Sequence, residues 1–132
     1  MDKNNIIPTE VTSVETPLDI ARAVAFAVDS KKAKDIKLLH VKDHTVITDY
    51  FVICTGTSRT QVRALADEAD YILEQHGLSC LRTEGYDSGT WVLKDYGSVI
   101  LHVFNEQNRA FYNLEKLYEN TGEVTDAELV ED

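Results

Sequence analysis

One continuous apolar run, followed at once by a helix start, places the strongest constraint on how this chain folds. Tyr50-Phe51-Val52-Ile53-Cys54 contains only apolar and aromatic residues and is stopped by Thr55-Gly56-Thr57. A short run of this kind predicts a strand buried on both faces, at the centre of a sheet. Ser58-Arg59-Thr60-Gln61 then has the pattern of a helix capping box. The chain is therefore expected to pass from a central strand directly into a helix.

Helical spacing of apolar residues predicts three helices. After the Ser58 cap, the apolar stripe ends before Gly77 and consists of Val62, Leu65, Ala66, Ala69, Ile72 and Leu73. Thr16-Pro17-Leu18-Asp19 combines a capping threonine with a proline suited to the first helical position, which predicts a helix from Pro17 to about Lys31. A last helix is expected from about Glu106 to Glu119, with one apolar edge formed by Phe111, Leu114 and Tyr118.

Short apolar segments predict four further strands. They are Asp35–Val41, Leu78–Thr83, Trp91–Tyr96 and Val99–Phe104. The last two flank Gly97-Ser98 and should pair as an antiparallel hairpin, and the two glycines of Glu84–Gly89 predict a loop. The resulting order, α-β-β-α-β-β-β-α, favours an α/β (α+β) fold: a single compact domain in which helices pack on a mixed sheet.

The formal charge of −10 is concentrated at the two ends of the chain. Residues 119–132 contain six acidic residues and no lysine or arginine, whereas residues 17–118 carry fourteen acids and twelve bases. We expect a flexible N-terminal arm at 1–16, a folded domain at 17–119 and an acidic, disordered tail at 120–132. A nearly neutral body with only a modest lysine cluster at 31–37 lacks the basic stripe that grips phosphates. The partner is predicted to be a protein, with no direct sequence-specific binding of nucleic acid.

The composition also predicts a cytoplasmic location. No apolar stretch is long enough to cross a membrane, and the first sixteen residues lack the basic start and apolar run of a signal peptide. Cys54 and Cys80 lie in apolar segments without a CxxC pattern, as expected of buried, reduced thiols.

Patterns that carry catalytic chemistry are weak in this sequence. The turn around Thr57 and Ser58 lies between a strand and a helix, where free backbone N–H groups can hold an anion, but it has neither a GxGxxG nor a Walker pattern. His40 and His44 have no further ligand nearby, so no metal site is predicted. We expect a protein that is not an enzyme and has no cofactor. The alternative is a nucleotidyltransferase-like enzyme that binds a nucleotide at the Thr57-Ser58 turn.

The segment Trp91-Val92-Leu93-Lys94-Asp95-Tyr96-Gly97 carries the features of a protein-binding surface. Alternation along a strand places Trp91, Leu93 and Asp95 on one face and Val92, Lys94 and Tyr96 on the other. Tryptophan and tyrosine beside a hairpin tip are common anchors of protein interfaces. Packing of Trp91 beneath a helix is an equally good interpretation of the sequence alone.

Several separate motifs resemble those of the ribosomal silencing factor (Iojap) family. They are Thr48-Asp49-Tyr50-Phe51-Val52-Ile53-Cys54-Thr55-Gly56-Thr57-Ser58, Glu84-Gly85, Trp91-Val92-Leu93-Lys94-Asp95-Tyr96-Gly97, His102-Val103-Phe104 and Arg109-Ala110-Phe111-Tyr112-Asn113-Leu114-Glu115. The resemblance spans about residues 18–118 and implies a nucleotidyltransferase-like topology without the catalytic signature. It implies a factor that binds the fourteenth protein of the large ribosomal subunit, blocks joining of the subunits and represses translation under nutrient limitation.

The predicted partner-binding surface follows from this resemblance and from the hairpin. It consists of Trp91, Leu93, Asp95 and Tyr96, with Glu84 and Asp87 as an acidic rim that attracts a basic ribosomal protein. A homodimer is expected in the absence of the partner, because family members tend to associate and because an exposed aromatic hairpin favours self-pairing.

Overall fold

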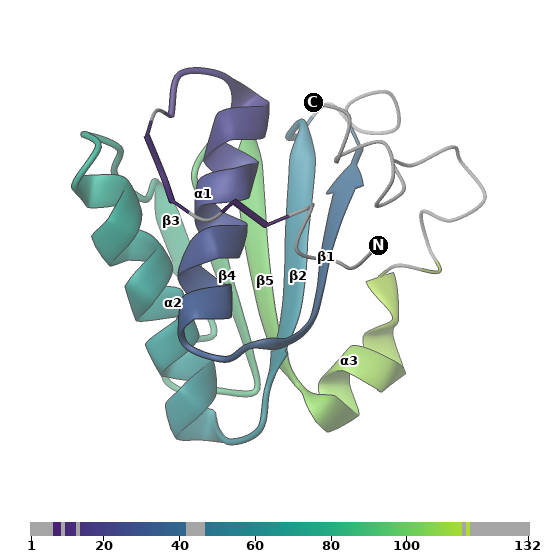
Figure 1. Cartoon of the computed structure of the whole chain (residues 1–132). Coiled ribbons are helices and arrows are strands. Elements are labelled where there is room, and N and C mark those ends of the chain that lie inside the picture. The colour runs from purple at the N-terminus through teal and green to yellow at the C-terminus, as the bar shows by residue number, and fades with distance from the viewer. Residues whose placement is uncertain (1–6, 9, 13, 42–46, 115, 117–132) are drawn as a thin grey trace.

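A five-stranded sheet carries two long helices on one of its faces (Figure 1). The computed structural model describes residues 7–8, 10–12, 14–41, 47–114 and 116. The helices are α1 (Pro17–Ser30), α2 (Arg59–Glu74) and α3 (Glu106–Tyr112), and the strands are β1 (Lys34–His40), β2 (Tyr50–Gly56), β3 (Arg82–Glu84), β4 (Trp91–Asp95) and β5 (Val99–Asn105). The predicted order of elements and the mixed α/β fold are confirmed.

The strand order is β1-β2-β5-β4-β3, and only β2 and β5 run parallel. Every residue of β2 is buried, as predicted for the apolar run, and the strand has neighbours on both sides. β4 and β5 form the predicted antiparallel hairpin, closed by a hydrogen bond from the Tyr96 N–H to the Val99 carbonyl. The sheet is therefore built around one parallel pair with antiparallel strands at both edges.

The two predicted helix starts are present, with one difference in detail. The hydroxyl of Thr16 accepts from the Asp19 N–H at 3.1 Å, and the Asp19 carboxylate accepts from the Thr16 N–H at 3.2 Å. Ser58 caps α2 through a 3.0 Å hydrogen bond from the Gln61 N–H. The Gln61 side chain accepts from the backbone of Thr57, one residue before the cap, and so ties the strand-to-helix turn to α2.

The third strand was placed too early by the sequence pattern. It was expected at Leu78–Thr83 but runs from Arg82 to Glu84. Gly77 has φ +83°, its N–H donates to the Glu74 carbonyl, and the Leu78 N–H donates to the Leu73 carbonyl. These are the two hydrogen bonds of a Schellman motif, in which an apolar residue commonly follows the glycine. The apolar character of Leu78 therefore belongs to the end of α2 and not to a strand.

The last helix is interrupted at Asn113, within the range predicted for it. α3 ends at Tyr112, because Asn113 adopts the left-handed conformation with φ 45° and its N–H donates to the Arg109 carbonyl. Asparagine is one of the few residues besides glycine that accept this conformation readily. Leu114 and Lys116 of the predicted continuation are helical again, whereas residues 115 and 117–119 and the acidic tail, 120–132, lie outside the described residues.

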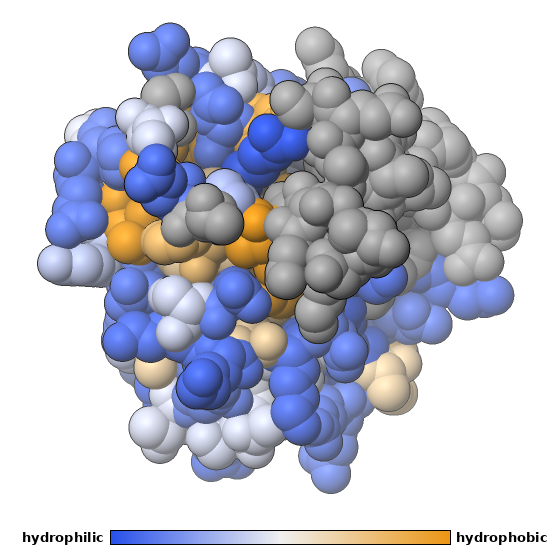
Figure 2. Space-filling model, viewed as in Figure 1, coloured by the Kyte–Doolittle hydropathy of each residue, from blue (hydrophilic) through white to orange (hydrophobic). Residues whose placement is uncertain are grey.

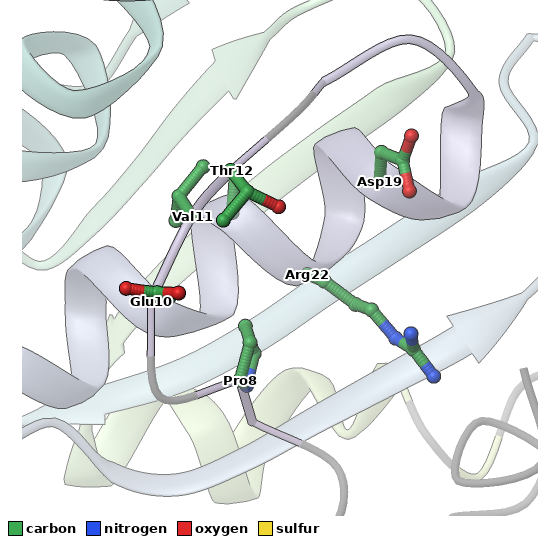
Figure 3. Close-up of a pocket in the computed structure, with 7 residues that line it drawn as sticks. Pro8, Glu10, Val11, Thr12, Asp19 and Arg22 are labelled. Carbon is green, nitrogen blue, oxygen red and sulfur yellow. The ribbon is translucent and has the colours of Figure 1, made fainter.

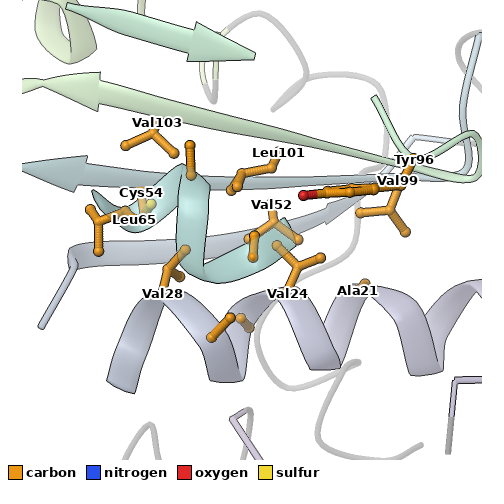
Figure 4. Close-up of a cluster of buried hydrophobic side chains, with 14 of the residues drawn as sticks. Ala21, Val24, Val28, Val52, Cys54, Leu65, Tyr96, Val99, Leu101 and Val103 are labelled. Carbon is orange, nitrogen blue, oxygen red and sulfur yellow. The ribbon is translucent and has the colours of Figure 1, made fainter. Parts of the chain in front are cut away.

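The main core lies between the sheet and the helices α1 and α2 (Figure 4). Small alanines on α1 let the helix approach closely, and the buried side chains of β2 and β5 fill the space beneath it. The labelled members are Ala21, Val24, Val28, Val52, Cys54, Leu65, Tyr96, Val99, Leu101 and Val103. Burial raises the pKa of the Cys54 thiol to about 12, so this cysteine is an unreactive core residue.

Part of the predicted N-terminal arm lies against the helices. Ile7, Val11 and Val14 are partly buried and pack on the main core. Figure 3 shows this segment crossing α1, with Pro8, Glu10, Val11 and Thr12 facing Asp19 and Arg22 across a small hollow. The same face of the molecule is largely hydrophilic, with hydrophobic residues visible towards its middle and left side (Figure 2).

Candidate protein-docking surface

The sheet face opposite α1 and α2 carries four of the six candidate functional residues, Glu84, Trp91, Leu93 and Asp95. Cα partners across β4 and β5 are Trp91 with Phe104, Leu93 with His102 and Asp95 with Ile100, and directly paired residues point to the same side of a sheet. A second apolar cluster lies here, formed by Leu39, Val41, Phe51, Ile53, Ile100 and Phe104, with Trp91, Leu93 and Leu114 packed against it. We call this side the outer face.

Trp91 is half-buried within a group of aromatic rings. Its ring centroid lies 4.8 Å from that of Phe104 and 4.6 Å from that of Tyr112. The indole N–H donates to Nδ1 of His102 at 3.1 Å. The packing interpretation of Trp91 therefore holds in part, because its ring contacts an aromatic residue of α3, while a portion of the side chain stays accessible.

His102 lies beneath Trp91 and is 5% exposed. Burial lowers its pKa to about 4, so the imidazole is neutral at physiological pH. Because Nδ1 accepts from Trp91, the proton of the neutral ring is on Nε2. Nε2 is buried and has no hydrogen-bond partner in the described part of the chain. An unsatisfied buried donor costs about 1–3 kcal/mol of stability.

Two of the predicted acidic residues lie on the outer face with Trp91. Glu84 pairs with Leu93 across β3 and β4, and Asp95 pairs with Arg82. Arg82 reaches both carboxylates, at 3.3 Å from Glu84 and 3.9 Å from Asp95. This arginine was not singled out from the sequence, and it offsets part of the negative charge that the two acids bring to the edge of the surface.

The structure does not bring Tyr96 or Asp87 to this surface. Tyr96 is 8% exposed, packs in the main core, and donates its hydroxyl to Asp70 of α2 at 2.7 Å. The backbone carbonyl of Asp87 accepts from Arg63, also on α2. Tyr96 follows the alternation of β4, which turns Val92 and Tyr96 towards the helices and Trp91 towards the outer face.

Two aromatic residues of α3 extend the outer face beyond the predicted set. Tyr112 is 47% exposed and contacts Trp91 with its ring tilted by 44°, while Phe111 is 78% exposed. No residue of α3 is fully buried, and Arg109 ties the helix to the sheet by donating to the Thr55 hydroxyl and the Asp35 carbonyl, both at 2.8 Å. The sequence pattern did not assign either residue to this surface, because their place depends on the path of α3 after β5.

The strand-to-helix turn favoured by the enzyme hypothesis lies at a different place. Thr57, Ser58 and Arg59 line a shallow hollow together with residues 105–107. The hydroxyl and N–H of Thr57 both donate to Gln61, and the Ser58 hydroxyl accepts from the Gln61 N–H. Three polar groups of the turn thus have partners within the chain. Among the described residues, no group of three or more His, Cys, Asp or Glu side chains could hold a metal ion.

Comparison with known proteins decides the family. A profile described as "Ribosomal silencing factor during starvation" matches residues 14–132. This chain belongs to the ribosomal silencing factor family. It is 46% identical over 92 residues to the ribosomal silencing factor RsfS of Halalkalibacterium halodurans, covering 70% of this chain and 79% of that protein. It is 41% identical over 99 residues to RsfS of Bacillus subtilis, covering 75% and 84%.

Solved structures support the same assignment. A Chromobacterium violaceum crystal structure superposes with a TM-score of 0.78 at 32% identity, covering 80% of this chain and 88% of that one. A Bacillus halodurans structure gives a TM-score of 0.71 at 40% identity, covering 80% and 96%. The sheet and helices of this chain are therefore shared with these related structures. In the described residues no helix is long and apolar enough to cross a membrane.

Proposed function

We propose that this member of the ribosomal silencing factor family binds the fourteenth protein of the large ribosomal subunit in the cytoplasm. Bound there, it keeps the small subunit from joining and lowers translation when nutrients are scarce. It acts by occupying a surface and catalyses no reaction. The observation that carries the proposal is the half-buried, hydrogen-bonded Trp91 on the outer face, next to exposed aromatic residues of α3.

The docking surface consists of Glu84, Trp91, Leu93 and Asp95, extended by Phe111 and Tyr112 of α3. Interface anchors are typically large aromatic side chains that are held in place before binding, because ordering them costs little at the moment of association. Trp91 meets this requirement through its hydrogen bond and its ring contacts. Tyr112 and Phe111 add accessible aromatic area beside it.

The charges at the edge of the docking surface favour a basic partner and should attract it moderately. Glu84 and Asp95 stand at the edge of the docking surface, and Arg82 between them neutralises part of their charge. Such a rim guides the approach of a basic protein and contributes little to the final affinity, because exposed ion pairs are weak. The aromatic centre of the surface is expected to provide most of the binding energy.

The test is co-sedimentation of the purified protein with large ribosomal subunits, followed by a subunit-joining assay. Truncating a central anchor costs about 2 kcal/mol or more, so Trp91→Ala should bind roughly thirtyfold more weakly and should no longer block joining. Tyr71→Ala is the matched control, because Tyr71 is a 56% exposed aromatic residue on α2, away from the outer face. Equal binding by both folded variants would show that the proposed docking surface does not bind the large subunit.

The enzyme alternative has a separate test. A nucleotidyltransferase-like protein needs a nucleotide and usually a divalent metal, whereas a silencing factor needs neither. Calorimetry with nucleoside triphosphates and magnesium should therefore show no specific binding. A dissociation constant near or below roughly 0.1 mM, which Ser58→Ala weakens, would favour the enzyme.

Self-association is also part of the proposal. An exposed aromatic surface without its partner favours pairing of two copies, so a homodimer is expected for the free protein. Sedimentation velocity at tens of micromolar is the direct measurement, and Trp91→Ala should shift the equilibrium towards monomer if the same surface is used. A parent protein that is monomeric throughout this range contradicts this part of the proposal.

A further inference from the structure

A buried histidine contacts the proposed anchor but is not itself accessible to a partner. His102 is 5% exposed, lies opposite Leu93 in the β4–β5 pair, and accepts the Trp91 indole N–H at 3.1 Å. Phe51 meets the imidazole edge-on with ring centroids 4.7 Å apart. The imidazole is thus fixed from the side of β2, while its acceptor nitrogen faces Trp91.

The arrangement is unfavourable for a residue whose role is only to fill the core. Nδ1 is used by Trp91, and Nε2 is left without a hydrogen-bond partner in the described part of the chain. An aromatic hydrocarbon such as phenylalanine would fill a similar volume and bury no unsatisfied donor. A histidine at this position therefore lowers stability. A role of its acceptor nitrogen in function would explain why this cost is retained.

We propose that His102 is a positioning residue, which orients the Trp91 indole for docking through the Nε1–Nδ1 hydrogen bond. This inference rests on the proposed function of the outer face. Phe104 stacks on a flat face of the indole and Tyr112 contacts the ring at a tilt of 44°, but these contacts leave the indole free to slide in its own plane. The hydrogen bond removes that freedom, because it fixes the direction of the ring edge.

The free protein offers a direct readout of this hydrogen bond. Trp91 is the only tryptophan of the chain, so a ¹⁵N spectrum contains a single indole N–H signal. In the parent this signal should be shifted downfield and exchange slowly with solvent. Long-range ¹H–¹⁵N spectra should show His102 with the proton on Nε2. A proton on Nδ1 would overturn the proposal, because that nitrogen could not then accept from Trp91.

Two substitutions of His102 separate the effect of its hydrogen-bond acceptor from the effect of its side-chain volume. His102→Asn keeps an acceptor oxygen close to the position of Nδ1, whereas His102→Phe keeps a ring and removes the acceptor. We expect His102→Phe to melt at the same or a higher temperature than the parent, to lose the downfield indole shift, and to bind large subunits about tenfold more weakly. His102→Asn should recover most of the shift and of the binding.

The outcomes distinguish this inference from the proposed function. If Trp91→Ala loses binding while His102→Phe binds like the parent, the positioning role is wrong and the docking surface stands. If Trp91→Ala binds like the parent, the docking surface fails and the positioning role fails with it. Should His102→Phe not fold, His102→Asn and the tautomer of the parent decide: a folded Asn variant with a solvent-like indole signal and parental binding is evidence against the proposal.

Discussion

On the helix-bearing side of the sheet, small and aliphatic residues of β2 and β5 meet alanines of α1 and leucines of α2, and the contact is closed to solvent. On the outer face, the rings of Phe51, Trp91, His102 and Phe104 meet one another, and the only described helix there has no fully buried residue. The first side has many interchangeable aliphatic contacts. The second has a few oriented ones, including a hydrogen bond between two rings.

The treatment of polar groups differs in the same way. On the helix side, Lys94 donates to Asp70 at 2.6 Å and to Thr83 at 3.0 Å, and Tyr96 donates to the other oxygen of Asp70. On the outer face, the buried Nε2 of His102 lacks a partner in the described chain. A fully satisfied network stabilises a core, whereas an unsatisfied donor is retained at a cost. The comparison supports the proposal that the outer face serves binding, while the helix-bearing side serves stability.

The largest expected effect is on stability and comes from the helix side. Leu65 is completely buried, so Leu65→Ala should lower the free energy of unfolding by about 2–5 kcal/mol. Leu93→Ala, on the half-exposed outer face, should cost less than half as much. Urea denaturation followed by circular dichroism measures both. Equal losses of unfolding free energy would mean that side chains on the outer face contribute as much to stability as those on the helix side.

The second effect is a pH dependence caused by His102. Its pKa is lowered by burial from 6.5 to about 4, so between these values the unfolded chain binds a proton that the folded chain does not. Stability is therefore complete above pH 6.5 and decreases as pH falls towards 4, by about 3 kcal/mol. His102→Phe should reduce this slope in a series of denaturation curves. The carboxylates titrate equally in both proteins, so an unchanged slope would contradict the buried, neutral state.

A smaller effect is expected at Tyr96, which the structure moves from the docking surface to the core. Tyr96→Phe removes the hydrogen bond to Asp70 and should lower stability by about 1 kcal/mol, because Asp70 keeps Lys94 as a partner. Binding to large subunits should not change. Loss of binding by a Tyr96→Phe protein that retains parental stability would show that Tyr96 belongs to the docking surface after all.

The smallest effect concerns the acidic rim. Glu84→Gln should change the affinity for large subunits by less than about 0.5 kcal/mol and should slow association mainly at low salt. Glu74→Gln is the control, because Glu74 is also exposed but lies at the end of α2. Stopped-flow mixing at two ionic strengths separates the rates. Identical rates for both variants would show that Glu84 does not guide the partner.

The sequence predicted those elements whose signals are local. The apolar run of β2, the caps at Thr16 and Ser58, and the alternation along β4 each depend on a few neighbouring residues, and each is present in the structure. The errors arose where one apolar residue had two explanations. Leu78 belongs to a helix end. Asn113 is a different case, because its left-handed conformation interrupts a helix whose apolar pattern continues beyond it.

The candidate site was predicted less completely, because it depends on strand register. Trp91 and Leu93 were identified from composition and alternation, but His102 comes next to them only when β4 and β5 pair around Gly97-Ser98. A two-residue hairpin turn fixes that register, so the pairing was available in principle. The contact of Tyr112 with Trp91 could not be predicted from the sequence, because it depends on the path that α3 takes after β5.

The parallel pairing of β2 with β5 has a consequence for how the chain acquires its structure during synthesis. Tyr50 pairs with Val99 and Gly56 with Asn105, so the two central strands lie forty-nine residues apart in sequence. Contacts between distant segments form slowly, because a long loop must close before they are made. The nascent chain can form α1, β1 and α2 early, but the sheet stays in two halves until residue 105 has left the exit tunnel. A protein proposed to restrain ribosomes thus becomes competent to do so only after β5 has emerged, because Trp91 and His102 meet only when β4 and β5 pair.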